Sequence, residues 1–151
     1  MVSSSVATEF VVAIPKTEQY RNRRLLDLAQ GMPCLLRVPG ICNRDPGTTV
    51  AAHSNWACHG KGMARKASDA YSCWSCGACH SWLDQGPAPK ATKQMAFMRA
   101  HADQVLLWRQ IATDPRRAPA DRKAAQWALD RLKATPNQPL ALNPQAQAAM
   151  N

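Results

Sequence analysis

Residues 76–86 read CGACHSWLDQG and combine two cysteines, a histidine and an aspartate. Cys76 and Cys79 are three positions apart, a spacing at which two thiolates bind one zinc ion. Residues 77–85 predict a short helix that the following Gly-Pro pair ends. The first amide groups of this helix would help to neutralise the sulfurs. A structural zinc site needs four ligands, so two more must come from elsewhere in the chain.

Cys34 and Cys42 are the natural second pair of ligands, because the Pro39-Gly40 turn between them folds the chain back. Such a site supplies on the order of 10 kcal/mol of folding free energy. That contribution would compensate for a chain poor in large apolar side chains. In the alternative interpretation, Cys34 and Cys42 are simply small buried residues.

The two remaining cysteines, Cys58 and Cys73, have no evident partner. A Cys73, Cys76 and Cys79 set is an alternative, but three sulfurs rarely converge from one strand-to-helix run, and we expect Cys73 to be a packed thiol. The run C-x-x-C-H also matches the attachment signature of a c-type haem, and C-x-x-C alone matches a thioredoxin-like redox pair. Both are disfavoured, because neither an export signal nor a preceding βαβ pattern is evident.

Two short strands are predicted before this helix, over residues 48–53 and 70–74. The segment between them, residues 54–68, is glycine-containing and basic, and is expected to be a loop. A basic helix is predicted over residues 17–30. After the C-x-x-C helix, apolar residues at three-to-four spacing predict two amphipathic helices, over residues 92–112 and 119–134.

The chain has 151 residues, which excludes two large domains. We expect a flexible leader over residues 1–17 and a zinc-stabilised domain over residues 18–90. Two helices within residues 91–135 are expected to pack on that domain. A tail over residues 136–151, rich in Pro, Gln and Ala, is expected to be disordered.

Nineteen Lys and Arg against ten Asp and Glu give a net charge of +9, which favours a polyanionic partner, nucleic acid before membrane. The longest apolar stretch, residues 10–14, falls far short of the roughly 20 residues of a membrane-spanning helix. It is also too short for a secretory signal. We therefore expect a cytoplasmic protein without a membrane partner, in which cysteines are metal ligands or free thiols.

His80 and Asp84 are four positions apart, so they share one helix face where a nitrogen and a carboxylate oxygen can hold a second cation. His53 ends the first predicted strand. Two strands and a helix with histidines at these places form the ββα-metal arrangement of HNH nucleases. The expected fold class is therefore α+β, with a small zinc-bound HNH-like core and flanking α-helices. In that arrangement His53 takes a proton from water and the cation stabilises the developing charge. Asp69 would orient His53 or add a ligand.

Each of these residues has an alternative interpretation. A histidine at a strand end, such as His53, is often a hydrogen-bonded surface group. His80 would also serve as a zinc ligand in place of a cysteine. Asp84 would also suit a solvated helix surface. His59 is an alternative base, or a phosphate contact from the loop. The loop also carries three basic residues, Lys61, Arg65 and Lys66. They either contact phosphate beside a cleft or belong to a solvated segment.

The segment from about residue 30 to residue 86 resembles the YbcO-type nuclease family of lambdoid prophages. The matching features, in order, are GMPCLLRVPGIC at 31–42, a P-x-T-x-V-x-A-H core ending at His53, HGKG at 59–62, Asp69, and CGACHSWLDQG. The resemblance implies a zinc-stabilised HNH-like fold that acts on phage or host DNA in the bacterial cytoplasm. It also implies zinc cysteines at 34, 42, 76 and 79, and an active site of His53, His80 and Asp84.

The expected function is therefore a metal-dependent DNA endonuclease of HNH type that hydrolyses phosphodiester bonds. Its catalytic cation would be magnesium, manganese or zinc. Ala52 stands where HNH proteins often have an acidic residue, and Asp69 stands where asparagine is usual. The alternative is thus a non-catalytic zinc module that binds DNA or scaffolds a recombination complex. A third possibility is an adaptor whose helices over residues 92–134 bind protein.

Overall fold

The computed structural model describes residues 20–62 and 66–134. Its strands are β1 (Val50–His53) and β2 (Ser72–Ser75), and its helices are α1 (Arg23–Asp27), α2 (Gly77–Gln85), α3 (Lys90–Thr113) and α4 (Pro119–Arg131). This mixture of a small sheet with helices agrees with the expected α+β class. The leader expected over residues 1–17 and the tail over 136–151 lie outside the described residues, and the division at residue 90 stays a prediction.

The two strands form an antiparallel sheet in which Val50 pairs with Ser75 and His53 pairs with Ser72. β2 leads directly into α2, because the Cys76 side chain caps this helix by accepting the N–H of Cys79. The hydroxyl of Thr48, just before β1, accepts the N–H of Gly77 at 3.1 Å. The start of β1 is thereby fixed against the start of α2.

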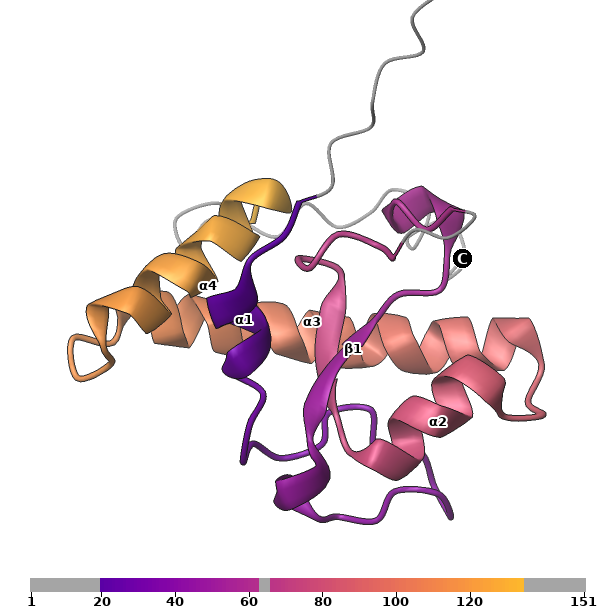
Figure 1. Ribbon diagram of the computed structural model, residues 1–151. Coiled ribbons are helices and arrows are strands. Elements are labelled where there is room, and N and C mark those ends of the chain that lie inside the picture. Colours follow the sequence, from indigo (N-terminus) through magenta and orange to yellow (C-terminus); the bar gives the residue numbers. More distant parts are fainter. Residues whose placement is uncertain (1–19, 63–65, 135–151) are drawn as a thin grey trace, which may run out of the picture.

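The long helix α3 runs behind the strands and links the two ends of the molecule (Figure 1). The side-chain oxygen of Gln104 accepts the N–H of Trp74 at 2.9 Å, which joins α3 to β2. One continuous cluster of buried side chains extends from Leu25 of α1 through Phe97 of α3 to Leu129 of α4. The helices after residue 90 therefore share a core with the strands. In the described part of the chain, no helix has both the length and the apolar character to cross a membrane.

Helix α1 is shorter than the helix predicted over residues 17–30. The side chain of Asn22 accepts the N–H of Leu25 and caps the helix there. Tyr20, two residues before Asn22, is held outside the helix, because the backbone N–H of Asp69 donates to the carbonyl of Tyr20 at 3.1 Å. This contact crosses more than forty residues of sequence, so the local pattern could not reveal it. Residues 17–19 lie outside the described part of the chain.

Truncation of Phe97 is expected to be among the most costly changes in the core. Its ring is fully buried and lies 5.5 Å from the ring of Trp56 and 5.7 Å from that of His101, between centroids. Phe97→Ala should lower the free energy of unfolding by about 3–5 kcal/mol, measured by denaturant unfolding. Met98→Ala is the matched control, because Met98 is 41% exposed. A similar loss in both variants would contradict this assignment of the core.

Candidate active site and candidate metal centre

Four cysteine sulfurs converge where the chain enters α2. Cys34, Cys42, Cys76 and Cys79 each offer a sulfur, and these atoms all lie within 4.8 Å of one another. The Sγ atoms of Cys42 and Cys76 are 3.9 Å apart. Four sulfurs at about 2.3 Å from a tetrahedral zinc ion would be separated by about 3.8 Å. The cluster therefore fits a metal such as zinc, and the expected convergence of the two pairs is observed.

Backbone groups stabilise these sulfurs as acceptors. The N–H of Arg37 points to Cys34 Sγ, and that of Val38 points to Cys79 Sγ, each with an N···S distance of 3.4 Å. Burial opposes ionisation of Cys76, but hydrogen bonds from the N–H groups of Cys79 and Asn43 outweigh it and lower the pKa of this thiol to about 7. Burial raises the pKa of Cys79. Bound metal takes cysteine as the thiolate, so metal binding would release protons here.

The other two cysteines lie outside this cluster. Cys73 is completely buried, and burial raises the pKa of its thiol. It is a packed thiol, as the sequence predicted. Cys58 is exposed, in the short 3₁₀ turn Ala57–His59.

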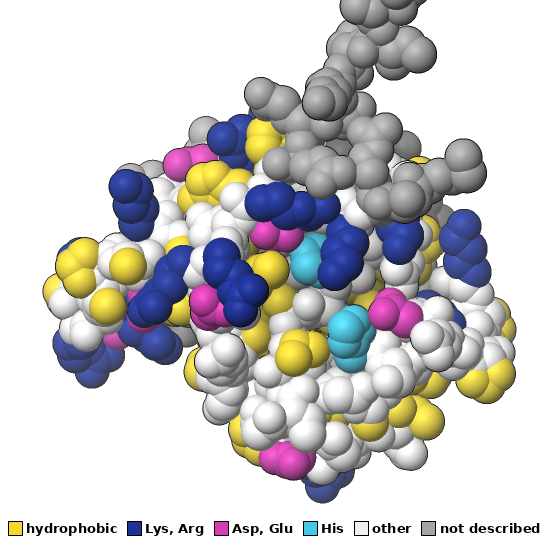
Figure 2. All heavy atoms as spheres, in the orientation of Figure 1, with side chains coloured by type: hydrophobic (Ala, Val, Ile, Leu, Met, Phe, Trp, Pro, Cys, Tyr) yellow, Lys and Arg dark blue, Asp and Glu magenta, His cyan; other side chains and the backbone are white. Residues whose placement is uncertain are grey.

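A cavity of about 400 Å³ opens beside α1, β1 and α2. His53 from the end of β1 and His80 from α2 both line it, with Asp84 and the basic side chains of Lys61 and Lys66. Figure 2 shows histidine side chains on this face, with Lys and Arg side chains around them. The structure thus places the two predicted histidines at one hollow.

His53 is oriented by the carboxylate of Asp69. Their Nε2 and Oδ1 atoms are 2.8 Å apart, and the Asp69 side chain is only 2% exposed. Burial opposes ionisation of Asp69, but the hydrogen bonds from His53 and the Asn22 N–H outweigh it and hold the pKa of Asp69 below its ordinary value. A carboxylate only accepts hydrogen bonds, so Nε2 of His53 carries the hydrogen. Nδ1 is then the ring nitrogen that can accept a proton.

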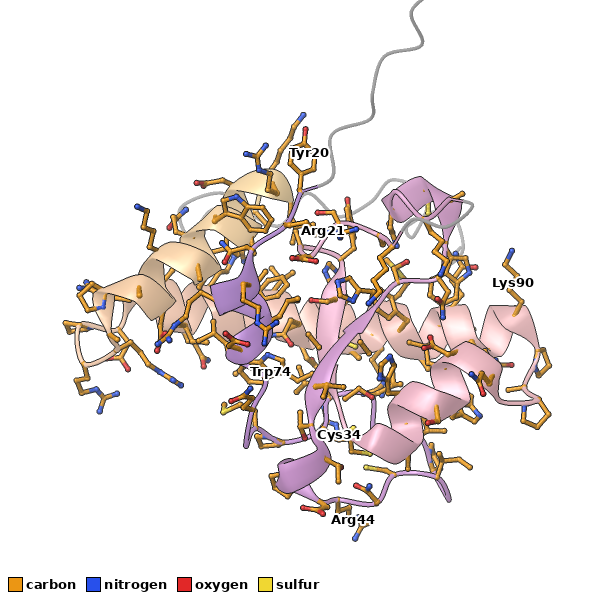
Figure 3. The ribbon with its side chains drawn as sticks, in the orientation of Figure 1. Tyr20, Arg21, Cys34, Arg44, Trp74 and Lys90 are labelled. Atoms are coloured by element: carbon orange, nitrogen blue, oxygen red, sulfur yellow. The ribbon has the colours of Figure 1, made fainter. Side chains whose placement is uncertain are left out.

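Two residues that sequence reasoning missed hold Asp69 in place. Arg21 Nη1 donates to Asp69 Oδ1 at 3.1 Å and to the carbonyl of Ala67 at 2.6 Å. The backbone N–H of Asn22 donates to Asp69 Oδ2 at 2.7 Å. Figure 3 shows Arg21 just ahead of α1, on the side toward the strands. No local spacing signals these contacts, because they join segments 47 and 48 residues apart.

The second predicted pair, His80 and Asp84, lies on one face of α2 as expected. His80 Nε2 and Asp84 Oδ2 are 3.2 Å apart, and the two side chains are 36% and 41% exposed. The amide of Asn55 donates to Asp84 Oδ1 at 2.8 Å. Asn55 was also missed, although its place two residues after His53 was a usable signal. An imidazole nitrogen and a carboxylate at this separation could hold a divalent cation.

The predicted residues of the basic loop do not all lie at the cavity. His59 does not line the cavity found in the described residues: its Nδ1 lies 2.6 Å from Ser54 Oγ, and its ring stacks on Tyr71 at 4.2 Å. Burial lowers the pKa of His59. Lys61 and Lys66 do line the cavity. Arg65 lies outside the described residues.

Comparison with known proteins gives one family match. The profile of the family described as "Putative nuclease YbcO" matches residues 23–113. "Putative nuclease YbcO" of Escherichia coli K12 and "Putative nuclease ybcO" of Enterobacteria phage 82 are each 37% identical over 59 residues, which is 38% of this chain and 58% of each relative. The solved structure of a putative bacteriophage protein from Escherichia coli K-12 aligns with 25% identity and a TM-score of 0.43, over 54% of this chain and 90% of that chain.

Proposed function

We propose that the cavity of this chain, which belongs to the family of the putative nuclease YbcO, hydrolyses phosphodiester bonds of DNA. The observation that supports this most is the meeting of two histidines at one hollow, each paired with a carboxylate. His53 is paired with the buried Asp69, and His80 with the exposed Asp84. The net charge of +9 favours a polyanionic substrate.

The chemistry we infer is of the HNH type. β1, β2 and α2 follow one another, with His53 at the last residue of β1 and His80 in the first half of α2. His53, held by Asp69, would take the proton of the attacking water at Nδ1. Lys61 and Lys66 would hold phosphate at the cavity.

The proposed cation ligands are His80 and Asp84. A divalent cation bound there would stabilise negative charge on the phosphate and on the leaving oxygen. Magnesium is often bound by only one or two carboxylates, with water filling its other positions, so a site with few protein ligands suffices. The amide of Asn55 fixes one oxygen of Asp84 and leaves the other directed at His80. We assign the four cysteines a separate, structural zinc ion.

The test is cleavage of supercoiled, linear and branched DNA by the full chain in magnesium, manganese, nickel or zinc. We expect cleavage with at least one added cation and none in protein dialysed free of loosely bound metal. His80→Ala should lower the rate at least about a hundredfold, because it removes a ligand of the charge-stabilising ion. Ser81→Ala is the matched control on the exposed face of α2. Absence of cleavage with every cation would overturn the proposal.

A second candidate is a DNA-binding module without catalysis. The residue directly before His53 is Ala52, so β1 offers no acidic ligand at that position. Binding would then persist in His80→Ala, with an affinity that falls steeply with salt, and no cation would give cleavage.

A further inference from the structure

A second hollow lies on the other flank of α1. It has a volume of about 410 Å³, and its lining comes from α1, the residues after it, and the region where α4 begins. Arg23, Asp27 and Gln30 line both this hollow and the cavity of His53 and His80. The two hollows therefore adjoin along α1, and we call the second one the α1 groove.

The charges of the α1 groove are unevenly paired. Arg23 Nε binds Asp27 at 2.9 Å, and Arg24 Nε binds Asp121 at 2.6 Å. These pairs leave both acidic residues of the groove neutralised. Arg117, half-buried in the groove, takes part in none of the salt bridges found among the described residues, although it lies near Asp114. Within residues 20–62 and 66–134, one arginine charge of the groove thus has no acidic partner at ion-pair distance.

We propose that the α1 groove binds backbone phosphates of the DNA that flanks the cleaved bond, with Arg117 as the principal contact. The inference rests on the proposed function, because it extends the path of the substrate from the cavity across α1. A guanidinium without an ion-pair partner suits a phosphate, which it can bind in a bidentate manner. Figure 2 shows that Lys and Arg side chains continue across this face beyond the histidines. A charged lining of this kind does not suit an apolar peptide.

The test compares two neighbouring arginines. Arg117 lines the groove, whereas Arg116 does not. The side chain of Arg116 already binds Asp114 at 3.0 Å. Binding of a fluorescent duplex DNA is measured by anisotropy without added divalent cation, between 50 and 200 mM salt. Arg117→Gln should reduce the slope of log affinity against log salt by about 1, whereas Arg116→Gln should leave it unchanged. Arg117→Lys, which keeps the charge, should restore most of the slope.

The result separates the groove from catalysis. A wild-type slope in Arg117→Gln, or equal reductions in Arg116→Gln and Arg117→Gln, would overturn the inference even if the protein cleaves DNA. The predicted difference in a protein that cleaves no DNA would support the groove and reject the proposed reaction. A thermal melt of Arg117→Gln that matches the wild type shows that the loss is not one of folding.

Discussion

Replacing His53 by alanine is expected to lower the rate of DNA cleavage by about 10²–10⁴-fold, the usual contribution of a general base. The reason is geometric. Nε2 of His53, a residue that lines the cavity, lies 2.8 Å from Oδ1 of Asp69, so the carboxylate keeps the hydrogen on Nε2 and leaves Nδ1 as the proton acceptor. The measurement is the single-turnover cleavage rate under the cation that gives the highest wild-type rate.

Asp69→Asn should give a smaller loss, of roughly 10-fold or more, because the amide fills the same space but no longer enforces one imidazole tautomer. Since Asp69 is buried and bound by Arg21 and the Asn22 N–H, part of the effect will appear as lower stability. A melting curve recorded beside the kinetics separates the two. A rate loss in a variant that melts normally at the assay temperature identifies the orienting role.

His59→Ala is the control that tests the alternative base. The ring of His59 stacks on Tyr71 and contacts Ser54, away from the cavity lining, so the rate should change by no more than a few-fold. If His59→Ala abolishes cleavage while His53→Ala does not, the assignment of the base is wrong.

The local features of the fold were accessible from the sequence because their causes are local. The spacing of Cys76 and Cys79 and the Gly-Pro stop predicted α2 to the residue. Apolar periodicity predicted α3 and α4 to within a few residues at each end. The turn at Pro39-Gly40, where Gly40 has a φ of +74°, predicted the second pair of sulfurs.

What the sequence did not reveal depends on contacts between distant segments. The start of α1 follows from the capping by Asn22 and from the hydrogen bond between Asp69 and Tyr20. The clamp of Arg21 on Asp69 and the bond of Asn55 to Asp84 likewise join segments that only the tertiary fold brings together. These are the contacts that set the orientation of the candidate catalytic groups. Spacing therefore predicted which side chains meet, but not which ones hold them.

Removal of the zinc ion that we propose at the four cysteines is expected to unfold the protein. Zinc binding to such a site contributes on the order of 10 kcal/mol, which is comparable to the whole stability of a domain, about 5–15 kcal/mol. Cys76 is the critical position, because its sulfur caps α2 and also lies 3.9 Å from the sulfur of Cys42. Cys76→Ser should therefore lose both bound zinc and the cooperative melting transition, measured by metal analysis and circular dichroism.

Cys58→Ser and Cys73→Ser are the controls that show whether unfolding of Cys76→Ser comes from loss of the metal or from loss of any thiol. Cys58 is exposed and outside the cluster, so its variant should keep one zinc per chain and the wild-type melting temperature. Cys73→Ser places a hydroxyl in a fully buried site. It should lower the free energy of unfolding by about 1–3 kcal/mol while the zinc content stays unchanged. Zinc retained at full occupancy in Cys76→Ser would contradict the four-sulfur site. If Cys76→Ser loses zinc and unfolds while Cys58→Ser does neither, the short strands and α2 depend on the ion. The cavity that holds both histidines then depends on the ion as well, because β1 and α2 line it.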